Sequence, residues 1–133
     1  MSDYTVKRVD EMDATFGGGF VLCRASLGVK SFGLQVLNAP PGWAGPEHKH
    51  EGMTGELAEV ANDGQEEVYY GLEGTAYLKL DDEEVALEPG VMVRVGPAQM
   101  RQVFTRDEPA KVLAIGAVPD GSYRAPAFTE IPA

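Results

Sequence analysis

Between residues 66 and 118, short strand-like runs alternate with turn sequences at short and regular intervals. The runs are rich in branched and aromatic residues, which favour strands. They cover Glu66 to Leu72, Thr75 to Leu80, Glu83 to Leu87, Val91 to Val95, Arg101 to Thr105 and Val112 to Val118. The turns fall at Glu73-Gly74, Asp81-Asp82, Pro89-Gly90 and Asp107-Glu108-Pro109. This spacing is typical of an all-β sandwich or barrel, and no long helix is predicted.

The remainder of the chain extends this pattern without adding a second domain. Two more strands are predicted over Phe20 to Leu27 and Ser31 to Asn38, joined as a hairpin at Gly28. At 133 residues, the chain has the length of a single domain. We divide it into an N-terminal lead with the first strand (1–30), a barrel (31–118) with an inserted loop (51–65), and a C-terminal arm (119–133). The arm holds too few apolar residues to form a core strand.

The composition excludes several classes of function. A formal net charge of −10 argues against nucleic acid or an anionic membrane as a partner, because such surfaces need clustered Lys and Arg. No apolar run reaches the length of a membrane span, and the first residues lack the pattern of a signal peptide. We therefore expect a soluble, cytoplasmic protein. The one cysteine, Cys23, lies in an apolar run and is expected to be buried and unreactive.

The two histidines of the chain, His48 and His50, stand two residues apart. On a strand, this spacing puts both imidazoles on the same face. Glu67 opens the strand that follows, so its carboxylate can converge with them. Two imidazoles and one carboxylate form the 2-His-1-carboxylate arrangement, which leaves open positions on a divalent ion. The sequence therefore predicts a metal site of His48, His50 and Glu67 that holds Fe, Mn, Ni or Zn.

The spacing Gly42-x5-His48-x-His50-x16-Glu67-x6-Gly74 resembles the first motif of the cupin superfamily. The run that begins Gly90-x5-Gly96 and ends at Arg101 is similar to a degenerate second motif. The resemblance implies a small, single-domain, cupin 2-like protein folded as a jelly-roll barrel, also called a double-stranded β-helix. It also implies a metal in the barrel mouth and a homodimer.

Two departures from the cupin pattern bear on function. Sixteen residues separate His50 from Glu67 where the family has only a few, so residues 51–65 look like an inserted loop that could cover the pocket. Acidic residues of this loop could replace Glu67 as the carboxylate ligand; they are Glu51, Glu56 and Glu59. The second departure is Arg101, which occupies the position of the second-motif histidine and cannot ligate a metal.

Arg101 leaves two interpretations open. It could clamp a carboxylate substrate beside the metal, or it could pair with Glu67 in a barrel without metal. Tyr69 and Met100 are the other predicted substrate-binding residues. The sequence predicts a small cupin that uses its metal site to act on a small, anionic molecule, as a dioxygenase, isomerase or decarboxylase. The alternative is a barrel without catalysis, which binds a small ligand or retains only a vestigial pocket.

The outer face of the strand at Glu67 supports the predicted dimer. If Glu67 and Tyr69 face the interior, then Val68, Tyr70 and Leu72 face outward. Such a face is too apolar for water, so we expect a second sheet or a second chain to cover it.

Overall fold

The structure is a computed structural model that describes residues 2–53 and 62–131. One short helix, α1 (Cys23–Leu27), accompanies the strands. The strands are β1 (Ala14–Thr15), β2 (Phe20–Val21), β3 (Gly33–Ala39), β4 (Glu66–Glu73), β5 (Ala76–Leu80), β6 (Glu83–Leu87), β7 (Met92–Val95), β8 (Gln102–Phe104) and β9 (Ala110–Ala117). Single 3₁₀ turns lie at Val9–Glu11, Phe16–Gly18 and Ala127–Thr129. No helix among the described residues is long and apolar enough to cross a membrane.

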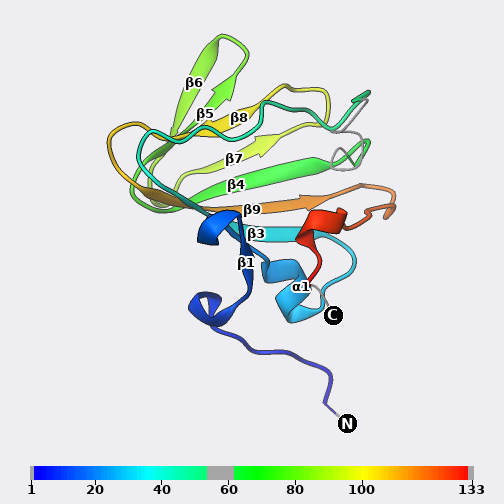
Figure 1. Ribbon diagram of the computed structural model, residues 1–133. Coiled ribbons are helices and arrows are strands. Elements are labelled where there is room, and N and C mark those ends of the chain that lie inside the picture. The colour runs from blue at the N-terminus through cyan, green and yellow to red at the C-terminus, as the bar shows by residue number, and fades with distance from the viewer. Residues whose placement is uncertain (1, 54–61, 132–133) are drawn as a thin grey trace.

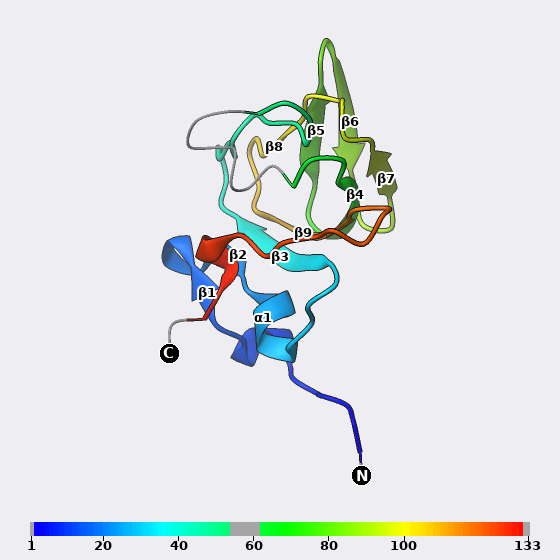
Figure 2. The ribbon, with the colours of Figure 1, turned by 90° about the vertical axis from the view of Figure 1, so that its right-hand side faces the viewer.

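The strands form two antiparallel sheets, as the turn spacing predicts. The larger sheet has the order β1-β2-β3-β9-β4-β7, and the smaller sheet has the order β6-β5-β8. Figure 1 shows β5, β6 and β8 above the larger sheet. Seen from the side, α1 and the first strands lie below the barrel, near the C-terminal residues (Figure 2). The all-β jelly-roll prediction is confirmed.

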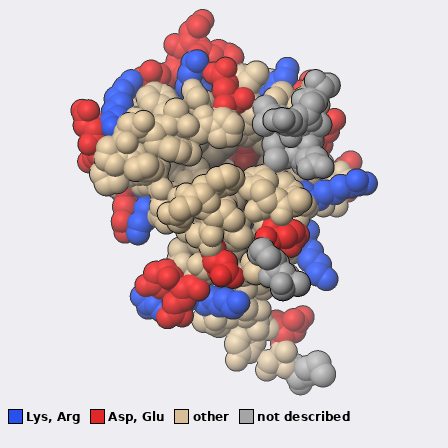
Figure 3. Space-filling model, in the orientation of Figure 1, with Lys and Arg blue, Asp and Glu red and all other residues tan. Residues whose placement is uncertain are grey.

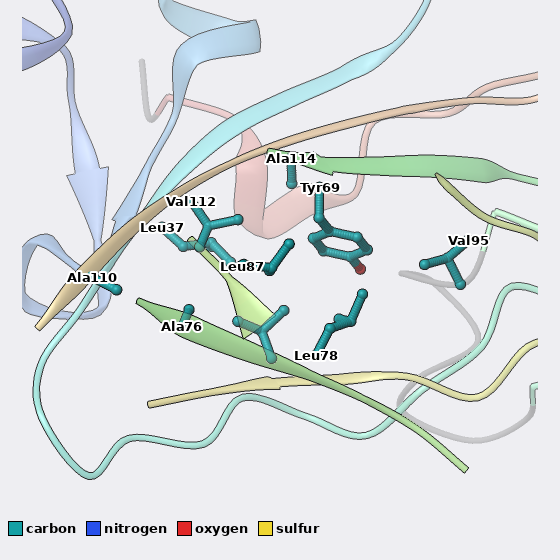
Figure 4. Packing of buried hydrophobic residues seen from close by; sticks show 10 residues of the cluster. Leu37, Tyr69, Ala76, Leu78, Leu87, Val95, Ala110, Val112 and Ala114 are labelled. Carbon is teal, nitrogen blue, oxygen red and sulfur yellow. The ribbon is translucent and has the colours of Figure 1, made fainter. Parts of the chain in front are cut away.

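Side chains from both sheets meet in one hydrophobic core (Figure 4). From the larger sheet come Leu37, Tyr69, Val112 and Ala114, and from the smaller sheet come Ala76, Leu78 and Leu87. Strand β4 shows how a strand contributes to this core. Its buried residues alternate with partly exposed ones from Glu66 to Gly71. Alternation places one face of a strand in the core and leaves the other outside. Glu67 and Tyr69 therefore point inward.

The strand predicted over Phe20 to Leu27 is wrong beyond Val21. Within this predicted strand, only Phe20–Val21 (β2) pairs with β3, and Cys23–Leu27 forms a helix that ends at Gly28 in the left-handed region, with φ of 83°. The apolar run is compatible with a strand or a helix, and a tertiary contact favours the helix. The buried guanidinium of Arg24 donates to the carbonyl oxygens of Val29 and Thr129, which ties the helix to the C-terminal arm. Cys23 is buried, as expected.

Large apolar side chains lie on the outer face of the larger sheet. Val68 and Tyr70 are partly exposed, and Leu72, Met92 and Ile115 are exposed by 37%, 67% and 37%. Their outward orientation agrees with the alternation in the sequence. The homodimer that would cover this face stays a prediction.

The last glycine of the first motif closes the turn between β4 and β5, and its conformation generates a stability prediction. Gly74 has φ of +62°, and a Cβ at this position would overlap the carbonyl oxygen of Pro109. Gly42, at the start of the motif, has φ of +67° with open space around it. The substitution Gly42→Ala should lower the free energy of unfolding by about 1 kcal/mol through backbone strain alone. The substitution Gly74→Ala adds a steric overlap to this strain, so it should lower the free energy of unfolding by about 2 kcal/mol more than Gly42→Ala does.

Urea denaturation of both variants measures the two effects. Equal losses would show that the backbone at Pro109 moves aside without cost.

Candidate metal centre

The segment that carries both histidines is aligned along β8. His48 and Arg101 exchange backbone hydrogen bonds of 2.9 Å and 2.8 Å, and the amide of His50 donates to the carbonyl oxygen of Pro97. This extended geometry gives the imidazoles the common direction that their spacing predicts. Their ring centroids lie 5.1 Å apart, with the rings nearly perpendicular. His50 is buried, whereas His48 is partly exposed.

Strand β4 supplies the carboxylate. Oε1 of Glu67 lies 2.8 Å from Nε2 of His50 and 3.7 Å from Nε2 of His48. The hydroxyl of Tyr69, two residues along the same face, donates to Oε1 over 2.9 Å. The predicted triad is therefore assembled: one donor atom from each of its three residues lies within 4.8 Å of the others.

The tautomer of His48 suits a ligand. Its Nδ1 lies 3.1 Å from the carbonyl oxygen of Pro46, an acceptor that requires the proton on Nδ1. In the neutral imidazole, Nε2 then carries the lone pair that a metal ion needs, and in the imidazolium the same nitrogen donates to Glu67. Metal-bound histidines commonly have their second nitrogen fixed in this way.

Arg101 lies behind Glu67 and is fully buried, with 0% exposure. Its Nη1 donates to Oε1 of Glu67 over 3.3 Å, and its Nη2 donates to the carbonyl oxygen of Gly96 over 2.6 Å. The guanidinium is a permanent cation, and the two bonds fix its position beside the carboxylate. The arrangement suits a residue that positions Glu67.

The surroundings of Glu67 keep it ionised. Burial opposes the charge, but hydrogen bonds from His48 and His50 and their positive charge outweigh it and hold the pKa of Glu67 well below its usual range. The opposite holds for Tyr69, because burial and the nearby charge of Glu67 raise the pKa of its hydroxyl well above the ordinary value. Tyr69 is therefore a neutral hydrogen-bond donor at physiological pH.

The triad faces a cavity of about 680 Å³. The cavity is lined by the triad, by Tyr69 and by Trp43, together with polar and apolar residues of β3 and of the C-terminal arm. In the space-filling view, a largely uncharged surface surrounds a central hollow, and charged side chains stand mostly around it (Figure 3). In the described part of the chain, no Lys or Arg side chain lines the cavity.

The other predicted site residues differ in their placement. Tyr69 lines the cavity, but neither Arg101 nor Met100 is among its lining residues. The substrate-binding role of these residues stays a prediction, and the burial of Arg101 argues against direct contact with a ligand. Of the acidic residues that could compete with Glu67, Glu51 is exposed and outside the triad. Glu56 and Glu59 lie outside the described residues.

Sequence analysis overlooked Gln65, which belongs to this site. It is 5% exposed, and its Nε2 lies 3.4 Å from Nε2 of His50. Among the described residues, no hydrogen-bond partner faces its Oε1. Gly116 makes room for it, since a Cβ there would lie 2.5 Å from Nε2 of Gln65. Alternation carries the signal, because residues 65, 67 and 69 share the inner face of one strand.

Comparisons with known proteins bear on the fold. No protein-family model matches the chain, and no curated protein matches it in sequence. Among solved structures, a cupin protein from Bacteroides fragilis is 23% identical, covers 100% of this chain and 98% of its own, and has a TM-score of 0.69. The protein TT1209 from Thermus thermophilus is 21% identical, with coverages of 85% and 96% and a TM-score of 0.63.

A Cupin 2 conserved barrel domain protein from Salinispora arenicola is 21% identical over 68% of this chain and 66% of that protein, with a TM-score of 0.54. The fold is therefore that of a small cupin barrel.

The buried pair of Arg101 and Glu67 generates a prediction. The substitution Arg101→Met removes the cation and leaves the carboxylate buried, so we expect a loss of about 3 kcal/mol in the free energy of unfolding at neutral pH. Arg94 is the matched control, because it pairs with Glu66 at the surface. The substitution Arg94→Met should cost no more than about 1 kcal/mol.

Chemical denaturation of the two variants at low ionic strength provides the measurement. A cost for Arg101→Met no larger than that for Arg94→Met would show that the imidazoles alone stabilise the charge of Glu67.

Proposed function

We propose that this protein binds one divalent metal ion through His48, His50 and Glu67 and uses it to bind and transform a small anionic molecule in the barrel cavity. The observation that carries this proposal is the convergence of three ligating groups, within 4.8 Å of one another, beside a cavity of about 680 Å³. Pockets of this size hold small molecules.

The donor set fits a divalent ion of the first transition row. With metal–ligand bonds of about 2.1 Å, neighbouring ligand atoms stand roughly 3.0 to 3.4 Å apart. The separations of Glu67 Oε1 from the two imidazole nitrogens, 2.8 Å and 3.7 Å, bracket that range.

Each residue of the site has a role in this proposal. His48 and His50 supply neutral nitrogen ligands, and Glu67 supplies a negative oxygen that lowers the net charge of the loaded site. Tyr69 and Arg101 fix the carboxylate in place. The ion, when bound, provides Lewis acidity and open positions for an anionic group. The cavity walls exclude water from much of the ligand.

One observation favours a second candidate, a ligand-binding barrel that works without metal. The guanidinium of Arg101 already neutralises Glu67, and its positive charge disfavours a cation nearby. In this alternative, the histidines and Glu67 are polar contacts for an uncharged or cationic ligand. The protein would then be a binding module rather than an enzyme.

Elemental analysis distinguishes the two candidates. The protein is purified without a chelator or a nickel-affinity tag and compared with the His48→Ala/His50→Ala double variant. We expect about one transition-metal ion per chain in the parent and none in the double variant, because imidazole nitrogens are the ligands that suit such ions. Absence of metal from the parent after reconstitution with Fe, Mn, Ni and Zn would contradict the proposal.

The carboxylate can be tested separately. The substitution Glu67→Gln keeps the size of the side chain but removes the charge, so the dissociation constant for the metal should rise at least about tenfold. Glu66, the neighbouring residue on the opposite face of β4, provides the control variant Glu66→Gln, which should bind as the parent does. Competition with a chromogenic chelator measures both constants. Equal constants for the Glu67 and Glu66 variants would move the carboxylate role to another residue.

Arg101 gives a prediction of opposite sign. The substitution Arg101→His removes a permanent cation from Glu67 and restores an imidazole at the second-motif position, so metal should bind more tightly, by about tenfold or more. The same chelator competition measures the change. An affinity that does not change would show that the side chain at position 101 does not reach the ion.

A further inference from the structure

We propose that the ligand of this site is an elongated amphipathic acid, with its anionic group at the triad and an aromatic tail seated between the C-terminal arm and the start of the chain. This inference rests on the proposed function, since the anionic group is held by the bound ion. It adds the class of the ligand, its orientation, and the residues that select it.

The first observation is a cluster of phenylalanines in the same cavity as the triad. Phe16, Phe20 and Phe128 all line it. Their ring centroids lie 5.3 Å to 6.3 Å apart, in tilted and edge-to-face pairs. Aromatic rings in such pairs accept a further ring by the same contacts. The cavity therefore has an aromatic seat, formed by these three residues.

The strand register places this seat away from the triad. Gly116 is paired both with Glu67 and with Gly33, so the triad lies level with the start of β3. Phe20 is paired with Leu37, four residues further along β3. At about 3.3 Å per residue, the two levels are roughly 13 Å apart. A ligand that reaches both needs a spacer between its anionic group and its ring.

The charged residues that line the cavity determine the orientation of the ligand. In the described part of the chain, Glu67 is the one carboxylate that lines the cavity, and no Lys or Arg side chain does so. An anionic group therefore finds a counter-charge only at the metal, whereas the three rings of the aromatic seat offer it none. The tail cannot exchange places with the acid.

The C-terminal arm builds one wall of the seat, and two contacts hold it in place. The side chain of Asn62 exchanges two hydrogen bonds of 2.8 Å with the backbone of Arg124. At the other end, Arg24 bonds the carbonyl oxygen of Thr129 and pairs with Glu130 over 3.0 Å. Phe128 thus reaches the cavity from an anchored segment rather than from a loose tail.

Titration with 7-phenylheptanoate and with heptanoate tests the proposal, because the longer spacer matches the distance between the two levels. Trp43, the one tryptophan of the chain, lines the cavity and reports binding by its fluorescence. In zinc-loaded protein, 7-phenylheptanoate should bind at least about tenfold more tightly than heptanoate, since it buries an additional ring. The substitution Phe128→Ala should remove most of this advantage and leave the zinc content unchanged.

Two further variants control for folding. Phe104 stacks on Tyr77 and does not line the cavity, so Phe104→Ala should retain the preference for the aromatic acid. Phe128→Leu keeps an apolar side chain on the arm and replaces Phe128→Ala as the test if the Ala variant is poorly folded. Its preference for the aromatic acid should lie between those of the parent and the Ala variant. Circular dichroism confirms the fold of each variant.

The outcomes separate this inference from the proposed function. If the parent binds zinc but shows no preference for 7-phenylheptanoate, or if Phe128→Ala leaves the preference intact, the aromatic seat is refuted while the metal site stands. If the parent binds no metal but retains a Phe128-dependent preference, the seat stands and the metal proposal fails. Absence of binding by either acid to zinc-loaded protein would overturn the inference.

Discussion

The buried carboxylate of Glu67 is the constraint on which the rest of the site depends. A buried charge is costly unless it is paired and hydrogen-bonded, and here one oxygen is approached by an imidazole, a phenol and a guanidinium. These partners come from three separate parts of the sequence: the His48–His50 segment, β4 and the residue before β8. Stabilising one anion therefore requires the sheets to close into a barrel, so the functional site and the fold constrain each other.

Much of this could be predicted from the sequence because the underlying rules are local. Alternation along β4 correctly places Glu67 and Tyr69 inside, and the spacing of His48 and His50 correctly gives them one direction. Turn residues locate most strand ends. The prediction that failed, a strand over Cys23–Leu27, depends on distant contacts. The helix there is held by a guanidinium that reaches the C-terminal arm, and no periodicity in the sequence predicts that contact.

The same distinction explains two residues whose roles in the site the sequence left open, Gln65 and Arg101. Gln65 follows the inward alternation of its strand, but its importance depends on Gly116, whose missing side chain leaves the space that the amide fills. Arg101 stands where the second cupin motif has a histidine, and the sequence leaves its direction open. The barrel settles this by bringing Gly96 and Glu67 to opposite ends of the guanidinium, which makes it a support for the carboxylate.

The burial of Arg101 and the residues that line the cavity bear on the chemistry that we propose for the barrel. Arg101 is fully buried and pairs with Glu67, and the described residues that line the cavity include no Lys or Arg. In the proposed function, recognition of an anion therefore depends on the bound ion, whereas selectivity among anions depends on the aromatic seat. Metal loading and ligand choice would then be set by different parts of the chain: the former by β4 and the histidine segment, the latter by Phe16, Phe20 and the anchored arm.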